Sequence, residues 1–231
     1  MILTPIRPDT RDAVIDAFAL SLAGQDIALQ VFRRIAASGK FRVEDVKAWH
    51  ADAVALATRF GMDPLDERPQ RSFSWDGRRV RAATEPAVLF HEIAHFQLAS
   101  PERRKLFDFG LGAGPETGLI ALANHVACVE GTARETEEAM ASLLGILWET
   151  AHDQPALRAF EEQNWFEGVG RPGTSWFFCD TLQRLLDAGL IDADGQPRFV
   201  CRITSDPDPA LWPGSLAQHP ISDATGATAI P

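Results

Sequence analysis

Residues 89–95 read Leu89-Phe90-His91-Glu92-Ile93-Ala94-His95, an H-E-x-x-H motif inside an apolar segment. In an α-helix, residues four apart project from the same face, so His91 and His95 can offer two imidazole nitrogens to one cation. Glu92 then points towards the open coordination positions of that cation. The pattern predicts a catalytic metal site with two ligands and a general base.

The residues around the motif predict that it lies on a helix. Thr84 can act as the N-cap, Glu85 and Pro86 suit a first turn, and residues 87–99 contain neither Gly nor Pro. Ser100-Pro101 then ends the segment. The alternative is a pair of core histidines beside a surface glutamate. The other side chains of the segment already supply its apolar face, which favours the metal site.

Outward from this helix, the hydrophobic spacing predicts further helices, one hairpin and one strand. The hairpin covers residues 71–81, around Asp76-Gly77, and the strand covers residues 199–203. Four glycines between Asp108 and Gly118 indicate a loop. We therefore expect a mainly α (α+β) fold, a single enzyme domain of packed helices over residues 1–205, with residues 206–231 as an extended or disordered tail. The other predicted helices are 12–22, 26–37, 43–59, 119–130, 134–150, 154–166 and 174–188.

Composition narrows the class of partner. The chain has 231 residues, 45% of them hydrophobic, and a formal charge of −10. An acidic chain without a Lys/Arg-rich run is not expected to bind nucleic acid or an anionic membrane. No segment resembles a signal peptide or a membrane span, so we expect a cytoplasmic protein of undetermined oligomeric state. Three widely spaced cysteines, Cys128, Cys179 and Cys201, predict free thiols.

A catalytic metal centre of this kind needs a third protein ligand. Glu138 is the first choice, because it precedes the small residues Ala141, Ser142 and Gly145 on a helix that could pack closely against the motif. Glu135 and Glu137 are the other candidates. For these two, a solvated cluster of charges at a helix N-terminus is the favoured interpretation.

A di-metal site is the rival arrangement. Glu149 and His152 form a second Glu-x-x-His, and Glu92 with His95 forms another, as in di-iron bundles. At about 1.5 Å per residue, Glu138 and His152 would lie about 21 Å apart on one straight helix, so they cannot share a centre. The mononuclear version is preferred, because the di-metal version leaves His91 unexplained. His125 remains a candidate for contacting substrate or supporting a ligand.

Part of the chain resembles the elongation factor P hydroxylase family, or a divergent sister group of it. The resemblance rests on residues 90–95, on Glu102-Arg103-Arg104, on Asp108-Phe109-Gly110 and on the turn at residues 115–118. It implies a bacterial, cytoplasmic, metal-dependent enzyme using non-haem iron. The implied substrate is a modified lysine of elongation factor P. It also implies that His91, Glu92 and His95 form the metal motif.

Two chemistries suit the motif. With Fe(II), two histidines and one acid leave positions for O2 and substrate, which predicts a hydroxylase. With Zn(II), Glu92 would activate water for attack on a peptide bond, as in H-E-x-x-H metallopeptidases. Leu98 and Pro101 break the extended metzincin pattern, although an exposed hairpin edge near Phe73 would suit peptide docking. The hydroxylase is favoured, the peptidase is the alternative, and a structural metal site in a binding protein is a third hypothesis.

Overall fold

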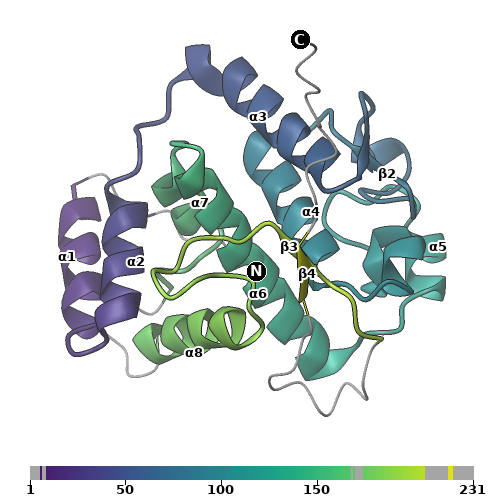
Figure 1. Ribbon diagram of the computed structural model, residues 1–231. Helices are drawn as coiled ribbons and strands as arrows, with labels where there is room; N and C mark the ends of the chain where they lie inside the picture. Colours follow the sequence, from purple (N-terminus) through teal and green to yellow (C-terminus); the bar gives the residue numbers. More distant parts are fainter. Residues whose placement is uncertain (1–5, 7–8, 168, 170–173, 206–217, 221–231) are drawn as a thin grey trace, which may run out of the picture.

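The computed structural model describes residue 6 and residues 9–167, 169, 174–205 and 218–220, and these form a mainly helical fold (Figure 1). Short 3-10 turns join several of the elements, at Val43–Asp45, Pro69–Arg71, Arg103–Lys105 and Phe107–Gly110. The helices are α1 (Arg11–Ser21), α2 (Asp26–Ala36), α3 (Val46–Arg59), α4 (Pro86–Leu98), α5 (Ile120–His125), α6 (Gly131–Ala151), α7 (Ala156–Glu162) and α8 (Thr174–Asp187). The strands are β1 (Asp63–Leu65), β2 (Arg79–Arg81), β3 (Val200–Arg202) and β4 (Gln218–Pro220).

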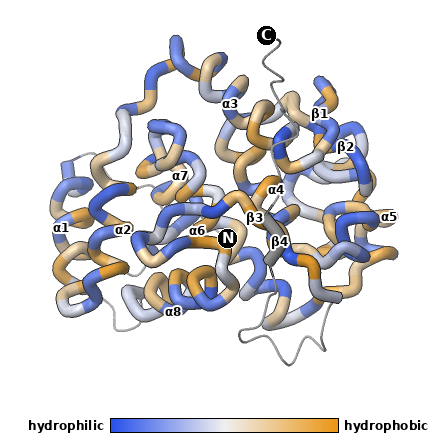
Figure 2. Tube along the Cα trace, viewed as in Figure 1, coloured by the Kyte–Doolittle hydropathy of each residue, from blue (hydrophilic) through white to orange (hydrophobic). Residues whose placement is uncertain are grey.

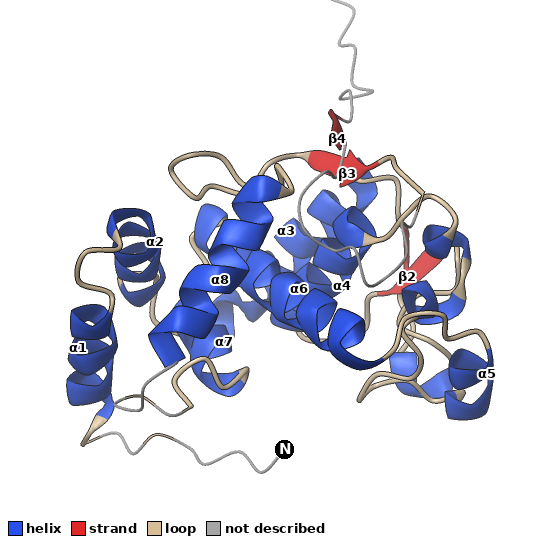
Figure 3. Ribbon diagram, turned by 90° about the horizontal axis from the view of Figure 1, so that it is seen from below, coloured by secondary structure: helices blue, strands red, loops and turns tan. Residues whose placement is uncertain are grey.

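Helix α6 is the centre of the fold. It runs beside α4, with α1, α2, α7 and α8 on one side and α5 with β2 on the other (Figures 1 and 3). Apolar residues of α6 are buried along most of its length, which its position between other helices explains. Helix α4 is similarly apolar, and Leu89, Phe90, Ile93 and Ala94 have no exposed surface. The motif helix is therefore held in the core rather than on the surface.

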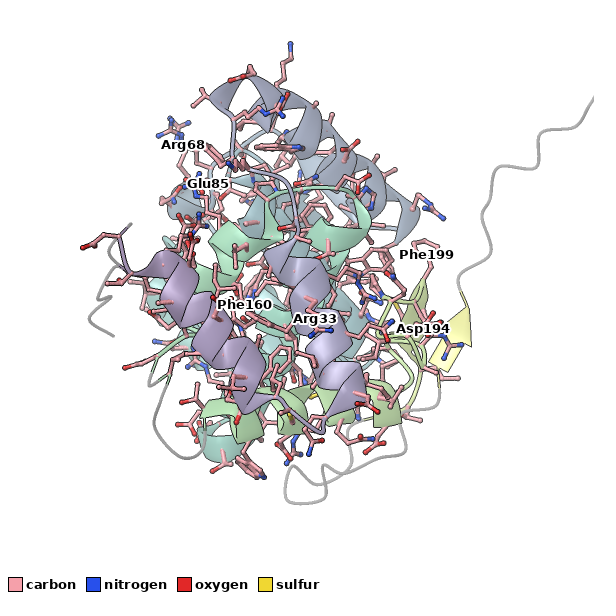
Figure 4. All side chains as sticks on the ribbon, turned by 90° about the vertical axis from the view of Figure 1, so that its left-hand side faces the viewer. Arg33, Arg68, Glu85, Phe160, Asp194 and Phe199 are labelled. Carbon is pink, nitrogen blue, oxygen red and sulfur yellow. The ribbon has the colours of Figure 1, made fainter. Side chains whose placement is uncertain are left out.

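A cluster of phenylalanine rings joins the helices distant from α4. Phe18 of α1 packs against Phe32 of α2, with ring centroids 4.6 Å apart, and meets Phe160 of α7 at 5.6 Å. Phe178 of α8 completes the contact at 5.6 Å from Phe18. Figure 4 labels Phe160 behind α1 and α2, and Figure 2 shows the alternation of hydrophobic and hydrophilic residues along these helices. Aromatic packing thus fixes this side of the molecule against α6.

The predicted hairpin at residues 71–81 is only partly correct. The chain does reverse at Asp76-Gly77, where Gly77 has φ +90°, and Trp75 forms an antiparallel bridge with Val80. However, β2 pairs in parallel with β1, which the sequence analysis did not predict. Phe73 and Trp75 are also only 5% and 2% exposed, so the side chains expected at an exposed edge are buried. Burial of the aromatic side chains explains the difference, because they pack inwards instead of lining a free strand.

Most predicted helices are present, with shifted ends. The motif helix begins after Glu85, and Thr84 is not its N-cap, since the Thr84 hydroxyl donates to Glu116 Oε2 at 2.9 Å instead. The helices predicted at 119–130 and 154–166 shorten to α5 and α7. The strand predicted at 199–203 is observed as β3. The predicted tail lies outside the described residues, apart from β4, which pairs antiparallel with β3.

Cys128, Cys179 and Cys201 are all free, as expected. Within the described ranges, none of the helices combines the length and the apolar character that crossing a membrane requires.

Candidate metal centre

Helices α4 and α6 bring His91, His95 and Glu138 together. The Nε2 atoms of the two histidines lie 2.9 Å apart. Glu138 Oε2 lies 3.5 Å from His91 Nε2 and 3.4 Å from His95 Nε2. The three side chains differ in exposure, since His95 is 5% exposed, His91 24% and Glu138 41%. The group is therefore buried on the α4 side and accessible from the α6 side.

The spacing of these donor atoms fits one metal ion. With metal–ligand bonds of about 2.1 Å, two neighbouring ligand atoms lie about 3.0 Å apart at a right angle and about 3.4 Å apart at a tetrahedral angle. The three observed distances, 2.9, 3.4 and 3.5 Å, lie within about 0.1 Å of this range. Two imidazoles and one carboxylate form a donor set used by non-haem iron and by zinc. Among the residues that the structure describes, this is the one such group of His, Cys, Asp or Glu side chains.

Gly145 allows the two helices to approach this closely. A Cβ atom added there would lie 3.2 Å from both the backbone nitrogen and the Cα of His91. A larger side chain would push α4 away from α6 and separate Glu138 from the histidines. The small residue expected from the sequence therefore has a direct role in the geometry of the site.

The buried ion pair of Glu137 and Arg103 lies next to the Nδ1 atom of His95. Glu137 Oε1 lies 3.7 Å from His95 Nδ1, slightly beyond hydrogen-bond length. Arg103 donates to both oxygens of Glu137, at 2.7 and 2.6 Å, and its Nε donates to the Phe109 carbonyl at 2.9 Å. Glu137 and Arg103 are 1% and 3% exposed. A carboxylate next to the second nitrogen of a ligating histidine orients its ring, and this pair is positioned to do so.

The charges around the histidines affect them unequally. Burial lowers the pKa of His91, and the neighbouring His95 lowers it further. Burial also acts to lower the pKa of His95, but Glu138 and Glu137 outweigh it and raise that pKa to about 10. Burial acts to raise the pKa of Glu138, and His95 reverses this, so that the carboxyl stays ionised. The carboxylates thus attract a positive charge between the rings, which a proton or a metal ion can supply.

Glu92 lies next to this centre without belonging to it. Burial raises its pKa to about 8, and the nearby carboxylates of Asp108 and Glu138 add to the effect against the opposing charge of His95. The Ser74 side chain forms a hydrogen bond with Glu92. A carboxyl whose pKa lies near neutrality can both take up and release a proton, which is the property expected of a general base.

The loop at residues 108–110 packs against His95. Asp108, Phe109 and Gly110 have φ values of 42°, 54° and 71°, a left-handed run that costs energy at the first two positions. Asp108 accepts hydrogen bonds from Thr117 Oγ1 at 2.6 Å and from the Trp75 backbone at 3.1 Å. The Phe109 ring stacks on His95, with centroids 5.8 Å apart. The strained loop thus closes one side of the centre.

The other sequence candidates lie elsewhere. Glu135 is exposed on α6, and His125 is exposed at the end of α5. Glu149 is buried near the far end of α6, and the His152 ring lies against Phe90, with centroids 5.5 Å apart. The di-metal alternative, which required Glu149 and His152 to join Glu92 and His95, finds no matching group among the described residues.

The prediction for Glu137 is wrong. This residue was expected to be solvated, whereas it is buried and faces His95. A signal was present in the helical spacing, because Glu137 falls in register with the buried residues Met140, Ala141 and Leu144. An acid in the core-facing stripe of a helix requires a partner, and Arg103 is that partner.

Comparison with known proteins does not assign the chain to a family. It matches no protein-family model, and neither the curated proteins nor the solved structures give a match. The function must therefore be argued from the site.

Proposed function

We propose that this protein is a metal-dependent hydroxylase, with Fe(II) held by His91, His95 and Glu138. The observation that carries the proposal is the set of three donor atoms, two imidazole nitrogens and one carboxylate oxygen, all within 4.8 Å of one another. This donor set leaves coordination positions for other molecules. A bound Fe(II) would supply activation of O2 in the reaction.

The chain's own residues would hold the reactants and move protons. Glu138, as the most exposed ligand, lies on the side from which a substrate can approach. Glu92 would accept and return a proton, since burial raises its pKa to about 8, close to neutrality. In the overall reaction a C–H bond becomes C–OH with one oxygen atom from O2. The second atom leaves as water, with two electrons and two protons from an external reductant.

The substrate in this proposal is a modified lysine side chain of a protein, with elongation factor P as the first candidate. Its support is the resemblance carried by residues 90–95 and by Asp108-Phe109-Gly110. In the fold, that second stretch is the loop against His95, so the two motifs of the resemblance meet at one centre.

A zinc-dependent peptidase is the second candidate. Its support is the position of Glu92 beside His95, because the same acid would take a proton from water in peptide hydrolysis. The burial of Phe73 removes a side chain expected at the edge that would have docked an extended peptide, which makes this candidate weaker.

Metal analysis combined with an oxygen test distinguishes the two candidates. Protein purified without oxygen would be analysed for iron and zinc, then incubated with unhydroxylated elongation factor P, a reductant and either O2 or argon. Under the hydroxylase proposal, mass spectrometry finds a gain of one oxygen atom only with iron and O2. Cleavage of the substrate with zinc under argon would instead establish the peptidase.

Glu92→Gln tests the proposed proton acceptor. The amide cannot accept the proton, so turnover should fall by about 10²–10⁴-fold. Bound metal should stay unchanged, because Glu92 is not one of the three ligands. Glu135→Gln, which removes an exposed charge on α6, is the matched control. Full activity in Glu92→Gln would remove this residue from the mechanism.

A further inference from the structure

A second pocket lies at the opposite end of α6 from the metal centre. It is a small hollow, open to solvent, between the start of α3, the start of α4, the end of α6 and α7. Glu149 lines it, and Glu138 and Glu149 are separated by about 16 Å along the axis at about 1.5 Å per residue. The pocket shares no residue with the metal centre.

The carboxyl of Glu149 is the unusual feature of this pocket. The residue is 3% exposed, and its Oε1 has no hydrogen-bond partner in the part of the chain that the structure describes. A buried carboxyl oxygen without a partner is costly, at about 1–3 kcal/mol, so such atoms are rare unless something else binds them. Because Glu149 lines the pocket, a ligand entering it could interact with this carboxyl group.

The charges at the pocket favour a cation. Glu85 and Glu162 lie at its exposed rim, so three carboxyl groups face it against the single guanidinium of Arg158. That guanidinium is already engaged, since Arg158 Nε lies 2.7 Å from Glu162 Oε1 and its Cζ lies 4.0 Å from the centre of the Phe41 ring. An anion would be repelled by this arrangement, whereas a cation would be attracted.

The remaining walls are aromatic and held in place. The Phe41 and Trp49 rings lie 5.7 Å apart, and Gln154 Nε2 donates to the Trp49 carbonyl at 3.1 Å. Aromatic faces beside carboxylates form the usual environment for an organic ammonium ion. Glu85, at the rim, is labelled in Figure 4 above α1 and α2. The pocket is therefore formed before any ligand binds.

We propose that this pocket binds an alkylammonium group, with Glu149 as the acceptor at its base and Trp49 as an apolar wall. The group belongs either to a free alkylamine or to a lysine side chain, which present the same chemistry. A small metal ion is disfavoured, because the described His, Cys, Asp and Glu side chains form no ligand group here. The site is independent of the hydroxylase proposal, since none of its residues is a metal ligand or Glu92.

Calorimetry and NMR with four small probes test the site. The charged probes are n-pentylamine and Nα-acetyl-lysine methylamide, and the neutral counterparts are n-pentanol and the Nε-acetylated form of the lysine compound. The measurements are made at pH 9, where the Glu149 carboxyl, whose pKa burial raises to about 8, is ionised and both ammonium probes, with a pKa of about 10.4, remain protonated. We expect at least one ammonium probe to bind about tenfold more tightly than its neutral counterpart and to shift the Trp49 indole resonance. Binding of pentylamine alone identifies a free amine as the source, and binding of the lysine compound identifies a side chain.

Two variants localise the binding. Glu149→Gln keeps the shape of the side chain and should weaken the ammonium probes about tenfold, while Glu135→Gln should leave them unchanged. Ala87→Phe fills the pocket without altering Glu149 and should abolish binding. Metal content should stay the same in all three variants. The proposal is overturned if neither ammonium probe binds, if pentanol binds as well as pentylamine, or if Ala87→Phe binds normally.

Discussion

Glu137 and Glu149 lie on the same helix and are buried to a similar extent, at 1% and 3% exposure, yet their surroundings are opposite. Glu137 receives two hydrogen bonds from Arg103 and lies beside His95. Glu149 faces a pocket with one oxygen unpartnered among the described residues. The pKa values follow this contrast. Burial acts to raise both, but His95 and Arg103 lower that of Glu137, while burial raises that of Glu149 to about 8.

The difference shows that α6 carries two buried acids with different partners. Glu137 has a charged partner within the protein, and we call this the complete end of α6. Glu149 has an oxygen without a partner among the described residues, and we call this the incomplete end. At the Glu137 end, the protein supplies the positive charge itself, and the carboxylate serves to hold another side chain in position. At the Glu149 end, no side chain of the described residues forms a hydrogen bond with Oε1 of the acid, and burial keeps the carboxyl protonated up to a pKa of about 8. Burial alone therefore does not reveal the role of an acid, whereas the presence or absence of a partner does.

The largest expected effect comes from removing the partner at the complete end. Arg103→Met leaves Glu137 buried without its counter-charge, and we expect the free energy of unfolding to fall by about 3–5 kcal/mol. Urea denaturation measures this change. Arg184→Met is the matched control, because Arg184 pairs with Asp180 in a half-exposed contact and should cost less than about 1 kcal/mol. Equal losses in the two variants would show that the comparison between buried and exposed pairs does not hold.

At the incomplete end, removing the charge should stabilise the protein at alkaline pH. The folded-state pKa of Glu149, about 8, lies above the unfolded value of 4.5. The stability it contributes is therefore full below pH 4.5 and is lost as the pH rises through 8. Between pH 5 and pH 8 the wild type should lose on the order of 3 kcal/mol relative to Glu149→Gln.

Urea denaturation at both pH values tests this difference. Glu135→Gln removes an exposed acid from the same helix and should change the stability by less than about 0.5 kcal/mol at either pH. A constant difference between wild type and Glu149→Gln across this range would mean that the carboxyl at the pocket is not perturbed.

Removal of a metal ligand should affect the metal centre and leave the pocket at Glu149 unchanged. His95→Ala deletes one of the three donor atoms, and we expect Fe(II) and Zn(II) to bind about a hundredfold more weakly, which equals about 2.7 kcal/mol. Competition with a chelating dye under anaerobic conditions measures this loss. His125→Ala, on the exposed end of α5, should bind both metals like the wild type. Unchanged affinity in His95→Ala would exclude the proposed centre.

The helical fold and the pairing of His91 with His95 could be predicted because they depend on local spacing, and the small residues that follow Glu138 on its helix made this acid the first choice of third ligand. His91 and His95 are one turn apart, and Glu138 precedes the small residue Gly145, which lets the two helices meet. These relations exist in any helix with this sequence, whatever surrounds it. The hydrophobic spacing along the chain likewise predicted packed helices.

The supporting residues could not be predicted with the same ease, because they depend on contacts between distant parts of the chain. Arg103 reaches Glu137 across 34 positions, and Asp108 bonds to Trp75 across 33. The parallel pairing of β1 with β2 has the same origin. The pocket at Glu149 is assembled from four separate segments, and the sequence indicated only a second Glu-x-x-His there.

The smallest predicted effect concerns the contact between Glu137 and His95. Glu137→Gln keeps an oxygen for Arg103 but removes the charge beside His95 Nδ1, so the metal affinity should fall about tenfold, at the lower end of the range for such partners. Affinity is measured below the unfolding temperature of the metal-free variant, so that loss of structure does not contribute. Glu135→Gln, two positions away, should bind metal like the wild type. If Glu137→Gln also bound metal with wild-type affinity, Glu137 would serve only to neutralise Arg103. The buried charges at the complete end of α6 would then stabilise the fold and not the metal centre.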